Sequence, residues 1–355
     1  MKPTEQLHDL GQSLWLDNIT RTMLADGTLG GYIDDLSVTG LTSNPTIFDK
    51  AISGGDAYDE QIAEAGPGAG STEELFFELA VADLREAADL FAPIHQRTDA
   101  VDGWVSLEVS PLLADDAAAT IEQVARLHGK AGRDNLFIKI PGTEAGHTAI
   151  EESIFAGTPV NVTLLFSREH YLGASEAYMR GVERRIEAGL DPAVGSVASL
   201  FVSRWDRAVM GTAPGELRGM LGIAIAGRTY RAYRELLDSE RWQRLANQGA
   251  RPQRLLFAST GTKDPEASDV LYVEALAAPN TVNTMPDATL KAFADHGRVG
   301  EPLPEDGGNA EQVLADFGAA GFDVEALAAQ LQEEGKQSFS DSWRELMGTI
   351  EGQLR

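Results

Sequence analysis

Cysteine is absent from this chain of 355 residues, and histidine is scarce, with six residues. The absence of cysteine excludes disulfides, thiolate nucleophiles and cysteine-based metal sites. The histidines show no ligand spacing such as His-Glu-x-x-His. The sequence therefore offers no cysteine-based metal site and no histidine metal-binding motif, and any nucleophile has to be a side chain other than cysteine.

Positive charge is also in short supply. Lys and Arg total 29 against 55 for Asp and Glu, which gives a formal net charge of −26. A field of this sign repels phosphate backbones, and no block rich in Lys or Arg offers a local exception. Nucleic-acid binding is therefore not expected, and phosphorylated small molecules would need a few well-placed cations.

Long apolar runs are missing as well. No stretch of about 18 uncharged apolar residues occurs, and the first residues lack the apolar centre of a signal peptide. We expect a cytoplasmic protein without membrane association. The apolar fraction of 43 % is nevertheless ample for a large core.

What the sequence does contain is a series of short apolar runs that alternate with helical patterns. This alternation is typical of βα units around a parallel sheet, and eight runs predict an α/β fold, a single (β/α)8 TIM barrel. A doubly wound open sheet is the rival, but no Gly-x-Gly-x-x-Gly follows any run. The predicted strands span residues 13–18, 37–42, 104–109, 136–140, 160–165, 194–202, 254–259 and 282–285.

Two regions exceed a minimal barrel. Residues 203–251 are long enough for two or three helices, including 215–233 and 235–246, and residues 286–355 form a helical C-terminal extension. We expect these helices to pack on one barrel domain that spans residues 1–355. The apolar stripe of Trp343, Leu346 and Ile350 in residues 341–354 could cover a barrel mouth, but such a stripe more commonly packs in the outer ring.

Polar residues occupy positions where barrel strands should be apolar. Catalytic groups of a barrel come from the C-terminal ends of several strands, and seven predicted strands carry polar residues at or just past that end. One such residue alone can cap a helix or close a turn, so the series is what indicates a site. The residues are Asp17, Asn44, Glu108, Lys139, Asn161, Thr163, Ser199, Arg204, Ser259 and Lys263.

Lys139 lies in the apolar run LFIKIP of residues 136–141. An ammonium is costly to desolvate in such surroundings, and a neighbourhood that favours the free amine makes lysine a nucleophile toward carbonyls. Because side chains alternate along a strand, Glu108 and Lys139 can both face the barrel interior. Two structural alternatives stay open: a buried ion pair, or a lysine that surfaces its ammonium.

These runs, in this order, closely resemble transaldolases, and the resemblance covers the first seven predicted strands and extends less distinctively through residue 285. The matching segments are 16–18 (LDN), 40–48 (GLTSNPTIF), 105–109 (VSLEV), 136–144 (LFIKIPGTE), 160–167 (VNVTLLFS), 197–206 (VASLFVSRWD) and 257–265 (FASTGTKDP).

The resemblance implies a barrel enzyme of the pentose phosphate pathway that needs neither a metal ion nor an organic cofactor. Its strand-four lysine would form a Schiff base with sedoheptulose 7-phosphate or fructose 6-phosphate. The enzyme would then pass a dihydroxyacetone unit to an aldose phosphate such as glyceraldehyde 3-phosphate or erythrose 4-phosphate. The expected partners are therefore small sugar phosphates, and the chain could be a monomer or a homodimer.

The resemblance also implies the catalytic roles. Lys139 matches the Schiff-base lysine, and Asp17 matches the acid/base that handles the proton of the cleaved hydroxyl. Glu108 and Thr163 match the pair that positions a catalytic water near the imine nitrogen.

Substrate binding follows from the same matches. Asn44 and Ser199 match groups that bind the dihydroxyacetone fragment, whereas Arg204 and Ser259 match phosphate-binding residues. Where several transaldolases have an arginine shortly after that serine, this chain has TGTK, and we assign Lys263 as the substitute. A lysine supplies a point charge without the bidentate fork of arginine.

Two other functions compete with this interpretation. A fructose 6-phosphate aldolase shares the lysine barrel but releases dihydroxyacetone to water, and such chains look shorter. A barrel that has lost turnover could instead serve as a binding protein. The presence of Lys139, Asp17 and Glu108 together argues against lost chemistry.

Overall fold

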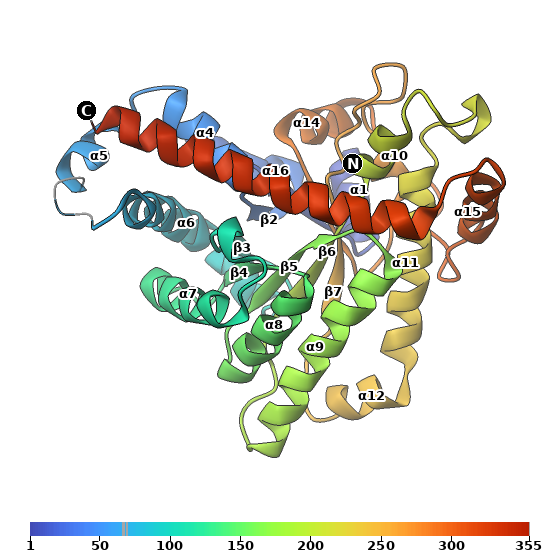
Figure 1. Ribbon diagram of the computed structural model, residues 1–355, viewed down its shortest axis with the longest axis horizontal. Helices are drawn as coiled ribbons and strands as arrows, with labels where there is room; N and C mark the ends of the chain where they lie inside the picture. Colours follow the sequence, from blue (N-terminus) through green and yellow to red (C-terminus); the bar gives the residue numbers. More distant parts are fainter. Residues whose placement is uncertain (66–67, 69, 355) are drawn as a thin grey trace.

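Eight parallel strands form the centre of the molecule in the computed structural model, which describes residues 1–65, 68 and 70–354 (Figure 1). Each strand pairs with its neighbours in the order β2-β1-β8-β7-β6-β5-β4-β3. The strands are β1 (Ser13–Asp17), β2 (Val38–Thr42), β3 (Val105–Glu108), β4 (Leu136–Pro141), β5 (Val160–Leu165), β6 (Ser196–Phe201), β7 (Gln253–Ala258) and β8 (Val282–Met285).

The two ends of this sheet meet between β2 and β3, so the predicted TIM barrel is confirmed. An isolated parallel bridge joins Gly40 to Trp104. There the Leu41 amide donates to the Trp104 carbonyl at 2.9 Å, and the Gly103 amide donates to the Thr39 carbonyl at 2.9 Å. Gly40 permits this closure, because a Cβ at that position would lie 2.7 Å from the Trp104 oxygen.

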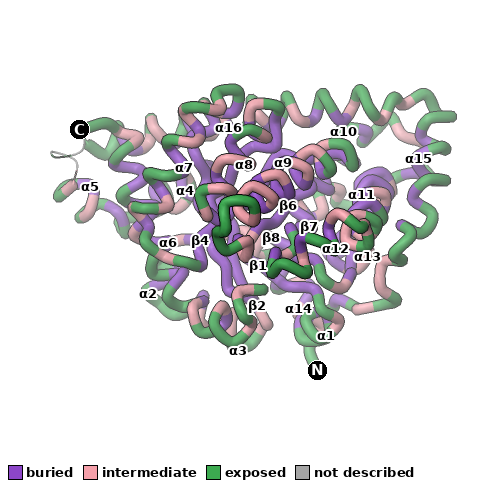
Figure 2. Tube along the Cα trace, turned by 90° about the horizontal axis from the view of Figure 1, so that it is seen from below, coloured by how far each residue is buried: buried purple, intermediate pink, exposed green. Residues whose placement is uncertain are grey.

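Helices surround the barrel, and buried residues concentrate at its centre (Figure 2). They are α1 (Pro3–Asp9), α2 (Arg21–Ala25), α3 (Thr28–Leu36), α4 (Pro45–Ser53), α5 (Asp59–Ala65), α6 (Thr72–Arg97), α7 (Ala117–Ala131), α8 (Glu144–Ala156), α9 (Arg168–Glu187), α10 (Ser203–Val209), α11 (Leu221–Asp238), α12 (Glu240–Ala246), α13 (Leu271–Ala275), α14 (Asp287–His296), α15 (Ala310–Ala319) and α16 (Val324–Gln353), with short 3₁₀ turns η2 (Pro111–Leu113) and η3 (Gly215–Leu217). Within this described part of the chain, no helix has the length and apolarity to span a membrane.

The predicted strands agree with the observed ones to within two residues at each end, and residues 160–165 and 282–285 agree at both ends. Helix boundaries differ more. The helix expected over residues 215–233 begins at Leu221 and continues to Asp238, and α12 starts only at Glu240, after the Ser239 cap. The cap of α7 is Asp116, whose side chain accepts from the Ala119 amide at 3.0 Å.

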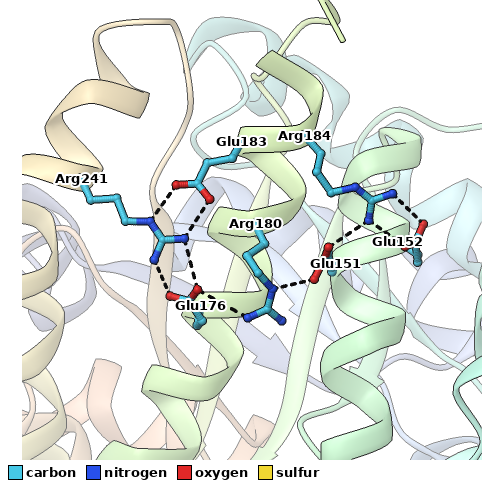
Figure 3. A network of polar contacts seen from close by, with 7 residues as sticks. All are labelled: Glu151, Glu152, Glu176, Arg180, Glu183, Arg184 and Arg241. Atoms are coloured by element: carbon cyan, nitrogen blue, oxygen red, sulfur yellow. Dashed lines mark hydrogen bonds and ion pairs between the residues drawn. The ribbon is translucent and has the colours of Figure 1, made fainter. Parts of the chain in front are cut away.

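Three helices of the outer ring are joined by charged side chains (Figure 3). Arg180 on α9 contacts Glu151 on α8 at 2.6 Å and Glu176 on its own helix at 3.5 Å. Arg241 on α12 contacts Glu183 on α9 at 2.7 Å. Arg184 pairs with Glu151 at 3.0 Å and with Glu152 at 2.7 Å. The network links elements that lie up to 90 residues apart in the chain, from Glu151 to Arg241.

The C-terminal extension ends in the 30-residue helix α16, which crosses the barrel end where strands β4 and β5 terminate (Figure 1). Its Trp343 packs edge-on against Phe76 of α6, with ring centroids 5.1 Å apart, so the predicted apolar stripe does contact the outer ring. An earlier part of the same helix, including Ser338 and Phe339, lies over the barrel opening. Residue 355 of the predicted extension is outside the described residues.

Candidate active site

A cavity of about 300 Å³ opens at the C-terminal ends of the strands. Parallel strands in a barrel bring these ends to one rim, so side chains distant in sequence meet there. Of the predicted site residues, Glu108 and Asn161 do not line the cavity but bond to the lining residues Lys139 and Ser199, and the others line it. The lining members are Asp17, Asn44, Lys139, Thr163, Ser199, Arg204, Ser259 and Lys263.

Lys139 reaches the floor of this cavity from β4, with a side chain only 7 % exposed. Its Nζ donates to the Ser43 carbonyl at 2.8 Å and to Glu108 Oε2 at 3.3 Å. The contact arises because Glu108 is the β3 register partner of Lys139. The alternative in which Lys139 carries its ammonium to the surface is therefore wrong, whereas an ion pair with Glu108 is present.

Glu108 is a buried carboxyl with two different oxygens. Burial raises its pKa, the positive charge of Lys139 partly opposes that rise, and Asp17 adds to it. Oε2 accepts from Lys139, but Oε1 has no hydrogen-bond partner among the described residues. Among the same described residues, the buried Thr163 Oγ1 also lacks a hydrogen-bond partner. These two buried polar atoms belong to residues around the Lys139 amine, and each can still bind water or substrate.

Asp17 ends strand β1 and is partly accessible from the cavity. Thr42 Oγ1 donates to its Oδ1 at 2.8 Å, and Thr42 Oγ1 lies 2.7 Å from the Thr284 hydroxyl. Burial raises the pKa of Asp17, while the Lys139 charge and the Thr42 hydrogen bond lower it. A raised pKa brings the exchange between the ionised and protonated carboxyl closer to neutral pH than in an exposed aspartate, which suits a group that accepts and donates a proton.

Asn44 and Ser199 each have a structural partner as well as a place in the cavity wall. Asn44 caps α4, where its Oδ1 accepts from the Ile47 amide at 3.0 Å. Ser199 donates to Asn161 Oδ1 at 2.7 Å, and Asn161 in turn donates to Ser106 at 3.2 Å. Asn161, predicted as part of the polar series, therefore supports Ser199 from below the cavity.

Backbone strain also marks the strand ends of the site. Leu164 follows Thr163 with a φ of 59°, where the β5–β6 register shifts, and Ser259 has a φ of 56°. Left-handed conformations are uncommon for residues with side chains and often occur at functional sites. Ser259 is held by Ser203, whose Oγ lies 2.9 Å from the Ser259 Oγ.

Cations supply the anion-binding capacity of the cavity. Arg204 from α10 and Lys263 after β7 both line it. Burial lowers the pKa of Arg204, and the charge of Arg207 adds to this effect, but a guanidinium remains charged at physiological pH. Lys50 of α4 also lines the cavity, and sequence reasoning missed this lysine. Its helical position gave no signal, because an exposed lysine is common on any helix.

The described residues contain no group of three or more His, Cys, Asp or Glu side chains arranged to hold a metal ion. The polar groups that line the cavity are amines, a guanidinium, a carboxyl, an amide and hydroxyl groups.

Comparison with known proteins adds an independent line of evidence. Residues 14–350 match the family model described as transaldolase/fructose-6-phosphate aldolase. A protein of Frankia alni named transaldolase is 44 % identical over 361 residues, covering 99 % of this chain and 97 % of the relative. An Arthrobacter transaldolase is 44 % identical with the same coverage. A Nostoc punctiforme protein named transaldolase 2 is 40 % identical over 370 residues, covering 99 % of this chain and 97 % of its own length.

Proposed function

This chain belongs to the transaldolase family of transferases, and from that premise we propose that it moves a dihydroxyacetone unit between sugar phosphates through a Schiff base on Lys139. The observation that carries the proposal is the position of the Lys139 amine. It lies on the floor of the cavity, 3.3 Å from Glu108, and Asp17 lines the same cavity. The donor would be sedoheptulose 7-phosphate or fructose 6-phosphate.

Schiff-base formation requires proton transfer at the amine. Glu108 can accept a proton from Nζ directly, since its Oε2 is within 3.3 Å and its pKa is raised by burial. The free amine then adds to the ketone carbonyl, and loss of water gives the protonated imine. We assign Glu108 Oε1 and Thr163 Oγ1 to the water that carries protons to and from this nitrogen, because neither atom has a partner in the described structure.

Carbon–carbon cleavage then requires a base for the hydroxyl proton of the departing aldose. Asp17 takes that proton as the bonding electrons move toward the imine, which leaves an enamine on Lys139. The acceptor aldehyde is attacked by the enamine carbon, and Asp17 returns the proton to the new hydroxyl. Hydrolysis of the imine releases the product ketose and restores the amine.

The remaining residues bind the substrate. Asn44 and Ser199, in the cavity wall, hold the hydroxyl groups of the dihydroxyacetone unit. Arg204 and Ser259 bind the phosphate together with Lys263, which takes the place of the family's second arginine. These few cations offset the repulsion that a net charge of −26 exerts on a phosphorylated ligand.

Trapping tests the covalent step. The protein is incubated with fructose 6-phosphate and EDTA, reduced with borohydride, and mapped by peptide mass spectrometry. We expect one reduced adduct, on Lys139, and none in the Lys139→Met variant. Lys263→Met is a matched control, since it removes a cavity lysine but leaves the adduct on Lys139. An adduct on another lysine, or none, contradicts the Schiff-base assignment and favours a non-catalytic barrel.

A fructose 6-phosphate aldolase is the second candidate, because the matching family model includes that activity. The two functions differ in the fate of the enamine. A transaldolase turns over sedoheptulose 7-phosphate continuously only when an acceptor such as glyceraldehyde 3-phosphate is supplied. Release of free dihydroxyacetone at a comparable rate without an acceptor would favour the aldolase.

A further inference from the structure

Arg204 lies against aromatic rings, and the carboxylates of Glu108 and Glu334 act on it through their charge. Its guanidinium carbon is 5.1 Å from the ring centroid of Phe201 and 5.6 Å from that of Phe339. Among the described residues its guanidinium has no hydrogen bond or ion pair, although burial is large enough to lower its pKa. An arginine held by rings keeps its donors available for a ligand and has fewer orientations to lose on binding.

The two rings come from different parts of the fold. Phe201 ends strand β6, directly before the loop that leads to Arg204, whereas Phe339 belongs to the C-terminal helix α16. The rings pack edge to face, with centroids 6.3 Å apart and an interplanar angle of 67°. Phe339 is 8 % exposed and lines the cavity. The orientation of Arg204 therefore depends on where α16 sits.

The position of α16 is fixed by other residues on the same helical face. Gln332 and Gly335 precede Phe339 by seven and four residues, a spacing that places all three on one side. Gln332 Nε2 donates to the carbonyl of Gly142, just after β4, at 3.1 Å and to the carbonyl of Leu164, near the end of β5, at 3.0 Å. A Cβ at Gly335 would lie 3.4 Å from Arg204 Nη1 and 3.0 Å from Leu164 Cδ2, so the helix approaches closely there.

We propose that Phe339 is a positioning residue for phosphate recognition: α16 places its ring on the guanidinium of Arg204 and holds this arginine in the orientation that binds the substrate phosphate. The inference rests on the proposed role of Arg204. Phe339 acts through the arginine, and its contribution is therefore confined to ligands that carry a phosphate.

The test compares phosphorylated and unphosphorylated donors by borohydride trapping. Fructose 6-phosphate carries the phosphate, and dihydroxyacetone supplies the transferred fragment without it. We expect Phe339→Leu to raise the half-saturating concentration of fructose 6-phosphate by about 5- to 10-fold, in the range for loss of a partly buried cation–π contact. The value for dihydroxyacetone should stay the same, and Phe339→Tyr, which keeps the ring, should restore the binding of fructose 6-phosphate.

Trp343→Leu is the matched control for loosening of the helix, because Trp343 packs on Phe76 and Phe77 and does not contact Arg204. It should lower the thermal midpoint without changing the ratio of the two half-saturating concentrations. A Phe339→Leu variant that binds fructose 6-phosphate as the parent does overturns the proposal. An equal loss of affinity for dihydroxyacetone also overturns the proposal, since the ring would then support the whole cavity.

Arg204→Met separates failure of this inference from failure of the proposed function. If Arg204→Met does not weaken the binding of fructose 6-phosphate, the assignment of Arg204 to the phosphate is wrong. If Arg204→Met weakens the binding of fructose 6-phosphate but Phe339→Leu does not, only the role of Phe339 is wrong. In the double variant, Phe339→Leu should add no further loss, because its effect passes through an arginine that is no longer there.

Discussion

Asp17 shows how a single hydroxyl can set the working range of a carboxyl. Burial raises the pKa of Asp17, and the hydrogen bond from Thr42 lowers it. In the proposed mechanism cleavage requires the ionised form, so kcat/KM falls as the pH drops through this pKa. Removing the donor with Thr42→Val raises the pKa of Asp17 further. We expect the acid limb of the pH–rate profile to move to higher pH in this variant.

Thr284→Val provides the comparison for Thr42. Thr284 contacts the Thr42 hydroxyl at 2.7 Å, but its removal leaves the bond from Thr42 to Asp17 at 2.8 Å in place. The acid limb of kcat/KM should then keep the parent midpoint. If the acid limb of kcat/KM stays in place in Thr42→Val, the group that titrates there is not Asp17 but another, such as Glu108.

At the scale of elements, the charged network across α8, α9 and α12 predicts a salt-dependent contribution to stability (Figure 3). Arg180 bridges Glu151 and Glu176, with side chains 42 %, 22 % and 42 % exposed in that order. We expect Arg180→Gln to lower the free energy of unfolding in urea by about 0.5–1 kcal/mol at low salt. The loss should shrink in about 1 M NaCl, where the Debye length is roughly 3 Å.

Arg231→Gln is the matched variant for an isolated pair. Arg231 contacts Glu235 at 2.8 Å within one turn of α11, so its removal separates no neighbouring helices. Its effect on the unfolding free energy should be smaller than that of Arg180→Gln. Equal effects, or a loss that salt leaves unchanged, would show that Arg180 contributes through packing of its methylenes.

At the scale of the whole molecule, closure of the barrel depends on one glycine. A Cβ at Gly40 would lie 2.7 Å from both the Trp104 carbonyl and Trp15 Nε1. We expect Gly40→Ala to lower the free energy of unfolding by about 1–3 kcal/mol, the usual range for overpacking in a core. Urea denaturation followed by circular dichroism measures this change.

Gly30→Ala, on α3, is the control for the same chemical substitution in open space. Nothing lies within 4 Å of a Cβ at Gly30. Because alanine restricts the unfolded chain and favours a helix, this variant should be as stable as the parent or up to about 1 kcal/mol more stable. A Gly40→Ala variant with an unchanged midpoint would mean that the β2–β3 junction can open without cost.

Much of the barrel could be predicted from local sequence. Strands buried on both faces are continuous apolar runs, and this signal located all eight to within two residues. Local sequence does not decide the short apolar run around Leu271, because such a run fits a strand or a helix, and the structure forms α13 there. Helix ends were less predictable, because α11 and α12 are separated only by the capping residue Ser239.

Sequence by itself also determined which polar residues meet at the site, since parallel strands in a closed barrel bring their C-terminal ends to one rim. Lys139, Glu108 and Asp17 were found in this way. Only the tertiary structure decided where α16 lies. Its apolar stripe fits any apolar surface of suitable shape, whereas the bonds of Gln332 and the ring of Phe339 become meaningful once the strand ends and Arg204 are in place.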